Sequence, residues 1–172
     1  MLNKLKPVEK VLTTKTRIMI SRSLMISRLM YGMPLFLGET QKNRYKIHQT
    51  VMKLSRWSLK SYCFKTSVKE ICQRVGWETP RQMLLKSSAM FILNIIQNRK
   101  PNQLIEAIRF PRTRPGAQMT TKHNPKTETY RRSTIYQLVQ LYNQLPQHTK
   151  NCGQEDLKKI MKNLELVYVQ YD

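Results

Sequence analysis

The segment RIMISRSLMISRLMYGMP, from Arg17 to Pro34, constrains the fold more than any other part of the chain. Its apolar residues recur at close to helical spacing, and Gly32 and Pro34 then act as helix terminators. Pro7 suits the first turn of a helix, so the spacing predicts one long helix that ends at Tyr31. We expect this helix to be buried and the rest of the chain to pack against it. A helical wheel places four residues on its apolar face: Leu12, Met19, Ile26 and Met30.

The same helix carries basic side chains. Arg17 and Arg28 lie almost opposite the apolar face, which predicts a cationic edge. Lys15 and Arg22 lie closer to the apolar side, where a long basic side chain either snorkels to the rim or reaches a phosphate. Snorkelling is favoured for Lys15, and both interpretations remain open for Arg22.

The net charge indicates what kind of partner the chain has. Its 172 residues include 31 Lys and Arg against 10 Asp and Glu, which gives a formal charge of +21. The excess lies in residues 1–132, because basic and acidic residues balance from residue 133 onward. A chain this basic repels itself unless a polyanion neutralises it, and nucleic acid is the commonest polyanion. An acidic protein or an anionic membrane is the alternative partner.

Residues 35–110 are expected to form further helices. Gly is scarce and the long segments consist of helix-forming residues, so the composition favours an all-α fold. Thr40 is placed to cap a helix that ends near Leu59, with a basic edge of its own. The capping box Ser67–Glu70 opens a short helix. Two more helix starts follow, at Thr79-Pro80 and at Asn102.

The character of the chain changes at residues 110–132, which are rich in proline, threonine and basic residues. This segment is either a disordered linker or a basic arm that lies along a nucleic-acid backbone. A helix capped by Ser133 or Thr134, a turn from Gln147 to Gly153 and a final helix from Gln154 are expected to follow. We therefore predict an all-α helical bundle of about five to six helices in three parts: a bundle at 1–109, a long basic loop or arm at 110–132, and a helical hairpin at 133–172.

The sequence lacks the residues that catalysis by this chain alone would need. The only aspartates are Asp156 and Asp172, so no carboxylate cluster is available to bind divalent ions for phosphoryl transfer. The three histidines and three cysteines do not show the spacing of zinc ligands. We expect no catalytic residue, no metal and no cofactor. The isolated cysteines and the absence of a secretory signal or a long apolar run predict an intracellular protein, in nucleus, cytoplasm or an organelle, without a membrane partner.

Without catalytic residues, the function that the sequence still supports is binding. Aromatic residues alternate with basic ones at Arg56-Trp57, at Lys60 to Lys65 and at Tyr130 to Arg132, where a ring either stacks on a base or belongs to the core. For Trp57 the core interpretation is favoured. The predicted nucleic-acid contacts are Arg17, Arg22, Arg28, Lys46, Lys53, Arg56, Lys60, Arg112, Arg114, Lys122, Lys126, Arg131 and Arg132.

An ordered set of motifs resembles one protein family. Arg17 to Leu35 is similar to the segment after the palm in reverse transcriptases of non-LTR (LINE-type) retrotransposons. Lys53-Leu54-Ser55-Arg56 resembles the Lys-x-x-Arg helix that follows in that family, and Ser67 to Arg81 resembles its Gly-Trp stretch. Tyr130 to Ser133, with Tyr142-Asn143-Gln144-Leu145-Pro146, is similar to its late signature. Together the motifs span about residues 15–165.

This resemblance implies the thumb and C-terminal region of such an enzyme, a helical bundle that holds the template and primer by their backbones. The family's catalytic aspartates lie upstream in fingers and palm, and the chain contains no counterpart of them. The resemblance therefore implies RNA or RNA–DNA binding without polymerase activity of its own.

Two other interpretations stay open at the level of sequence. The chain is alternatively a structural RNA-binding subunit of a ribonucleoprotein particle such as a ribosome, with other protein subunits as neighbours. A third interpretation is a protein-interaction module whose Met-rich helices form an oligomer seam.

Overall fold

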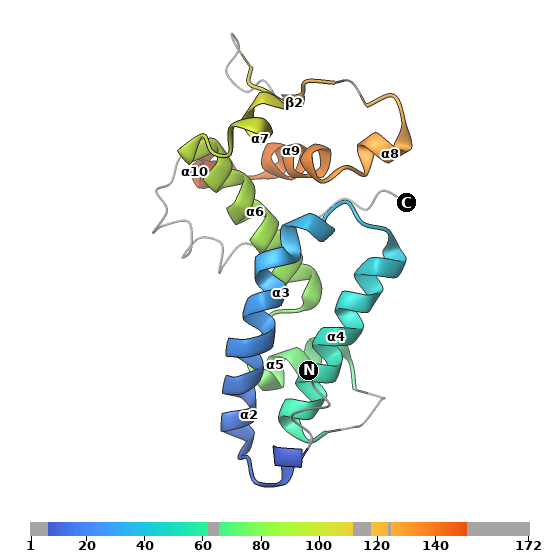
Figure 1. The fold of residues 1–172 in the computed structure, drawn as a ribbon, viewed down its shortest axis with the longest axis vertical. Helices are drawn as coiled ribbons and strands as arrows, with labels where there is room; N and C mark the ends of the chain where they lie inside the picture. The colour runs from blue at the N-terminus through green and yellow to red at the C-terminus, as the bar shows by residue number, and fades with distance from the viewer. Residues whose placement is uncertain (1–6, 62–65, 112–117, 124, 151–172) are drawn as a thin grey trace. The chain divides into compact units, whose positions relative to one another are not determined.

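The computed structural model describes residues 7–61, 66–111, 118–123 and 125–150, and these residues are predominantly helical (Figure 1). The prediction of a helical fold is confirmed in that broad sense, and a small two-stranded sheet adds to it. None of the helices in the described ranges is long and apolar enough to cross a bilayer. The elements in chain order are the 3-10 turn η1 (Pro7–Lys10), α2 (Thr14–Ile20), the π-helical turn η2 (Ser21–Ile26), α3 (Ser27–Gly32), the 3-10 turn η3 (Met33–Phe36), α4 (Gln41–Leu59), α5 (Val68–Val75), α6 (Pro80–Asn98), α7 (Asn102–Glu106), β1 (Ile108–Arg109), β2 (Thr120–Thr121), α8 (Glu128–Arg131), α9 (Thr134–Gln144) and α10 (Gln147–Lys150).

The chain divides into two compact units. The first comprises Met1–Gly32 and Thr40–Met83, and the second comprises Met33–Glu39 and Leu84–Asp172. The division falls within α6, whose first residues belong to the first unit and whose remainder belongs to the second. These units do not coincide with the three segments expected from the sequence, because the connection after Gly32 joins the second unit rather than the first.

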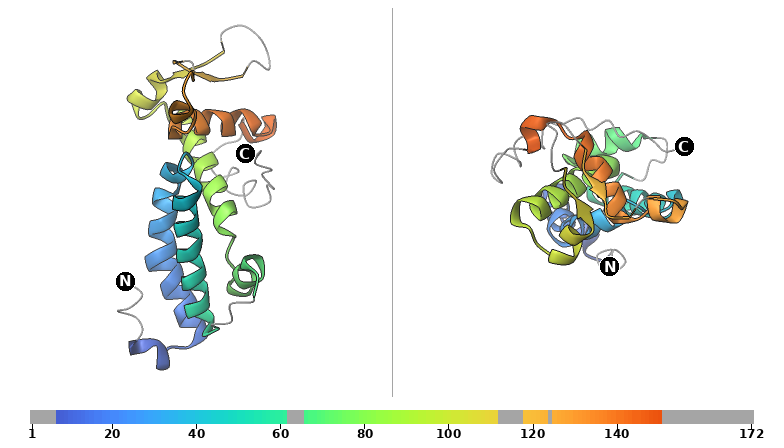
Figure 2. Two further views of the ribbon diagram at one scale, coloured as in Figure 1. Left: turned by 90° about the vertical axis from the view of Figure 1, so that its right-hand side faces the viewer. Right: turned by 90° about the horizontal axis from the view of Figure 1, so that it is seen from above.

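In the first unit, α2 and the turn η2 pack against α4, and α5 packs on α4 (Figure 2). Trp57 is only 1% exposed, so the core interpretation of this residue is correct. Cys72 lies fully buried in the same core, and burial raises the pKa of its thiol although a hydrogen bond with Ser55 lowers it in part. The buried apolar residues of this unit are Ile26, Ile47, Val51, Met52, Leu54, Trp57, Ile71, Cys72, Val75, Trp77 and Met83.

The first long helix begins later than predicted. Thr13 has an extended backbone, and its Oγ1 accepts a hydrogen bond from the Thr16 N–H at 3.2 Å, so it caps a helix that starts at Thr14. Pro7–Lys10 forms a separate 3-10 turn instead of the first turn of that helix. The other end was predicted well, because Gly32 is the last helical residue.

The predicted apolar face of this helix is wrong in part. Met19 is 62% exposed, whereas Arg17 and Ser21 are buried. The next buried residue, Ile26, follows Ser21 by five positions, within a π-helical turn that inserts one extra residue. A wheel with a constant 3.6-residue period cannot follow this change of phase, so it assigned the wrong residues to the interior.

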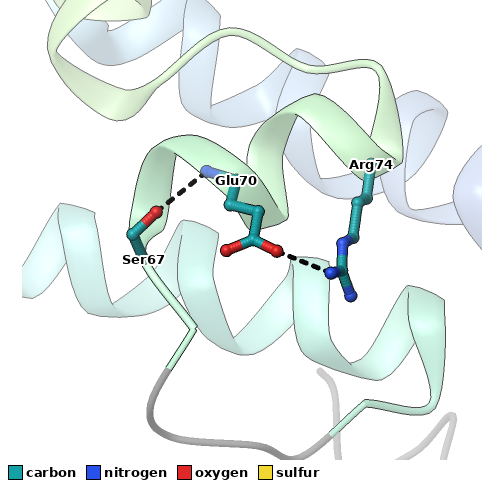
Figure 3. Close-up of polar contacts among 3 residues, drawn as sticks. All are labelled: Ser67, Glu70 and Arg74. Atoms are coloured by element: carbon teal, nitrogen blue, oxygen red, sulfur yellow. Dashed lines mark hydrogen bonds and ion pairs between the residues drawn. The ribbon is translucent and has the colours of Figure 1, made fainter.

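Local signals placed the other helices of the first unit. Gln41–Leu59 follows Thr40 as predicted. In α5, the Ser67 Oγ accepts from the Glu70 N–H at 3.2 Å, and the Glu70 carboxylate accepts from Arg74 at 2.5 Å (Figure 3). Gly76, with φ 72°, ends this helix in the left-handed region that favours glycine.

The second unit has a core formed by α6, the short sheet and α9. Strand β1 pairs antiparallel with β2, with Ile108 opposite Thr121, and α9 packs beside β2 (Figure 1). The sequence prediction missed these strands, and it assigned a turn where α10 forms. The predicted final helix from Gln154 lies outside the described residues. The buried core residues are Leu37, Leu85, Ala89, Ile92, Leu93, Ile108, Met119, Leu138, Val139, Leu141 and Leu145.

A pair of serines allows the helices of the first unit to approach closely. The Ser21 and Ser58 hydroxyls lie 2.8 Å apart, and both residues are 0% exposed. Ser55 is also fully buried and donates to the Val51 carbonyl of its own helix at 2.9 Å. Small side chains that satisfy their own hydroxyls fit a close contact that larger residues would separate.

We predict that Ser58→Leu lowers the free energy of unfolding by about 1–3 kcal/mol, because the longer side chain overpacks this contact. The matched control is Thr50→Leu, an exposed position on the same helix, where a change within about 0.5 kcal/mol is expected. Urea unfolding of both variants measures the difference. Equal stabilities would show that the serine contact is not tightly packed.

Candidate nucleic-acid interface

Five basic residues form a continuous row along α4, which we call the α4 stripe: Lys42, Lys46, Lys53, Arg56 and Lys60. At 100° per residue they fall within an arc of roughly 80°, and they extend along about 27 Å of the helix axis. All four lysines are exposed, and Arg56 is half-buried with further contacts of its own. The predicted basic edge of this helix is therefore one surface.

Lys60 extends the stripe beyond the last helical residue. It adopts the left-handed conformation with φ 52°, and its N–H donates to the Trp57 carbonyl at 3.3 Å. The Ser61 N–H then donates to the Arg56 carbonyl at 3.1 Å. These bonds satisfy carbonyls that the end of a helix leaves open, so the backbone of Lys60 is held at a defined place next to the C-terminus of α4.

Glu39 precedes the stripe by three residues, and no acidic residue lies within it. The chain has no Asp or Glu between Thr40 and Lys69, and none between Lys10 and Gly38. Both helices of the hairpin in the first unit therefore lack carboxylates, whereas α5 has the Glu70–Arg74 pair. The positive potential of the stripe is not offset within its own hairpin. The sequence analysis assigned the excess charge to residues 1–132 as a whole, although the lack of acidic residues in these two helices was also visible in the sequence.

The arginines of the first helix have different environments. Arg22 and Arg28 are exposed, as a binding role requires. Arg17, predicted to lie on a cationic edge, is instead 1% exposed. Its Nη1 donates to the Trp57 carbonyl at 3.4 Å, and its Nη2 donates to the Thr14 Oγ1 at 3.0 Å. The C-terminal end of α4 attracts a cation, which explains why an arginine is accepted inside this unit. We therefore leave Arg17 out of the interface.

In the second unit, two of the basic residues predicted in the arm, Arg131 and Arg132, form local contacts. Lys122 and Lys126 are exposed. Arg131 is also exposed, and its Nε donates to the Pro125 carbonyl at 3.4 Å. Arg132 is exposed and forms an ion pair with Glu128. The remaining two predicted contacts, Arg112 and Arg114, lie outside the described residues.

The backbone at Arg132 is fixed by a close approach of Gly38. A Cβ added at Gly38 would lie 1.8 Å from the Arg132 carbonyl oxygen and 3.2 Å from the Ser133 carbonyl carbon. Only a residue without a side chain permits this contact between two backbones. The connection before α4 and the start of α9 are thereby held together within the second unit, next to the basic pair Arg131 and Arg132.

Asn143 holds the base of the arm on α9. Its Oδ1 accepts from the Met119 N–H at 2.9 Å, and its Nδ2 donates to the Met119 carbonyl at 2.9 Å. Lys150 donates to the Asn143 carbonyl at 3.2 Å and lies 5.0 Å from the Tyr142 ring centre. Burial raises the pKa of Tyr142 and lowers that of Lys150. The side-chain amide of Asn143 thus pairs with the backbone of Met119 as a residue of a neighbouring strand would.

We predict that Asn143→Leu lowers the stability of the second unit by about 2 kcal/mol, because it leaves the buried Met119 backbone groups without these partners. Gln144→Leu changes the exposed neighbouring residue and is the matched control. Hydrogen exchange of the Met119 amide measures the effect. Unchanged protection in Asn143→Leu would contradict the role assigned to this side chain.

The aromatic residues predicted near basic ones have mixed placements. Trp57 is buried in the core, and Tyr130 is half-buried with its ring 6.4 Å from that of Tyr136. Tyr62 and Phe64 lie outside the described residues. Outside these motifs, Tyr45 lies on α4 and is 60% exposed. In the sequence, the signal that could have indicated this residue was its position three residues after the basic Lys42.

Across the described ranges, no three His, Cys, Asp or Glu side chains come together in an arrangement that would hold a metal ion. The charged groups that gather on one surface are basic side chains. Such a surface can bind phosphates through charge and hydrogen bonds.

Comparison of the chain with protein-family models, with curated proteins and with solved structures finds no match. Any functional assignment therefore depends on the residues themselves and on the geometry described above.

Proposed function

We propose that this chain is a nucleic-acid-binding helical module that binds RNA or an RNA–DNA hybrid through the α4 stripe and performs no catalysis by itself. The observation that carries the proposal is the exposed row of lysines on a helical hairpin whose two helices contain no carboxylate. Arg22 and Arg28 on the first helix, and the basic residues of the arm, would add further phosphate contacts.

The dimensions of the stripe suit a nucleic-acid backbone. A row of cations about 27 Å long can contact several phosphates of one backbone. Lysine is a flexible point charge without the planar fork that reads guanine edges. The surface is therefore suited to backbone contacts rather than to recognition of a base sequence.

The proposal agrees with the family resemblance, in which the segment after the palm is a helical grip on template and primer. That resemblance remains a prediction from the ordered motifs between Arg17 and Pro146. The resemblance suggests where the module comes from, and the α4 stripe explains physically why it would bind nucleic acid.

Salt dependence is the direct test of this function. If all five cations of the stripe engage phosphates, log K should fall with log salt with a slope of about −3.5 on single strands. The variant Lys46→Gln/Lys53→Gln should reduce the steepness by about 1.4 and weaken binding roughly 25-fold at 0.1 M salt. Fluorescence anisotropy with a labelled RNA, titrated at several salt concentrations, measures both quantities.

The charge-matched control is Lys69→Gln/Lys100→Gln, which removes two exposed lysines outside the stripe. Its affinity and slope should stay close to those of the unmodified protein. Equal losses in the two variants would mean that only net charge matters, and the absence of binding at low salt would refute the function.

A further inference from the structure

The aromatic pair Tyr45–His48 stands out on the surface of the first unit. The two rings are stacked with centroids 6.0 Å apart and planes at 12°. Tyr45 is nevertheless 60% exposed, although folding normally gains free energy by burying an aromatic ring. A flat, accessible ring held in one orientation by a neighbour is the arrangement on which another ring can stack.

The pair borders the α4 stripe. Lys42 precedes Tyr45 by three residues and Gln49 follows it by four, so both neighbour it on the helix surface. Lys46 is the next residue in sequence, and all three of these side chains are exposed. A strand whose phosphates lie on the stripe would therefore have its bases within reach of the tyrosine ring.

We propose that Tyr45, supported by His48, is a base-stacking site that takes an unpaired nucleobase, so that the α4 stripe prefers single-stranded nucleic acid to a duplex. This inference deepens the proposed function and depends on it. In a duplex the faces of the bases are already stacked on one another, and only the backbone is available to the stripe. In a single strand each base offers a free face to the ring, whatever its identity.

A purely structural role for the pair predicts something different. Side chains three residues apart stabilise a helix by only about 0.2–0.5 kcal/mol, and the loss of that contact would not discriminate between single and double strands. The ratio of the single-strand affinity to the duplex affinity therefore distinguishes a stacking role from a structural one, whereas either affinity alone does not.

The test compares a 12-nucleotide RNA carrying 2-aminopurine with the corresponding 12-base-pair RNA duplex, both titrated with the full chain. Tyr45→Leu should weaken single-strand binding roughly 5- to 100-fold and abolish quenching of the 2-aminopurine, with less than a twofold effect on the duplex. Tyr31→Leu, which changes a 93% exposed tyrosine on α3 rather than α4, should leave both affinities unchanged. Circular dichroism of both variants establishes that they are folded.

A second variant keeps the inference testable if Tyr45→Leu does not fold. Tyr45→Trp retains a stacking surface and adds an exposed indole, whereas Trp57 and Trp77 are buried. Its fluorescence should be quenched by the single strand and not by the duplex.

The outcomes separate the two proposals. If the unmodified protein binds neither RNA at low salt, the proposed function fails. If it binds both, three results would refute the stacking site. Tyr45→Leu would weaken binding of the single strand and of the duplex equally, or Tyr31→Leu would weaken single-strand binding as much as Tyr45→Leu does. In the third, the single strand would not quench the fluorescence of Tyr45→Trp.

Discussion

The packing of α4 against the segment Thr14–Gly32 is the contact on which the first unit depends. Ser21 and Ser58 let the helices approach, and Arg17 donates to the Trp57 carbonyl in the C-terminal turn of α4. Because one side of α4 is committed to this contact and to the buried residues beneath it, the opposite side is left to solvent. The lysines of the α4 stripe lie on that opposite side, so the packing of the hairpin determines which basic residues can meet a ligand.

Signals that act within a few residues were readable from the sequence. The caps at Ser67 and Ser133 and the Thr79-Pro80 start placed α5, α9 and α6, and the basic edge expected on the helix after Thr40 lies on α4. The interior of the first helix was not readable, because the π-helical turn at Ser21–Ile26 changes the phase of the buried face. Strands β1 and β2 have only two residues each, too few to show an alternating pattern. Their pairing depends on long-range contacts such as the one between Asn143 and Met119.

The distribution of charged residues along the chain is more informative than the net charge. A basic protein with acids scattered among its lysines would form internal ion pairs, as Arg74 and Arg132 do here with Glu70 and Glu128. The two helices of the hairpin in the first unit have no carboxylate with which to do this. In the proposed function, an external polyanion would neutralise these cations, and the release of counterions from the nucleic acid would favour binding.

Lysine footprinting of the full chain with and without a single-stranded RNA would show whether the α4 stripe is the surface that binds nucleic acid. Acetylation measured residue by residue by mass spectrometry should fall several-fold at Lys42, Lys46, Lys53 and Lys60 when RNA is present, while Lys69 and Lys100 stay equally reactive. Protection of Lys69 and Lys100 with continued modification of the four lysines on α4 would contradict the account.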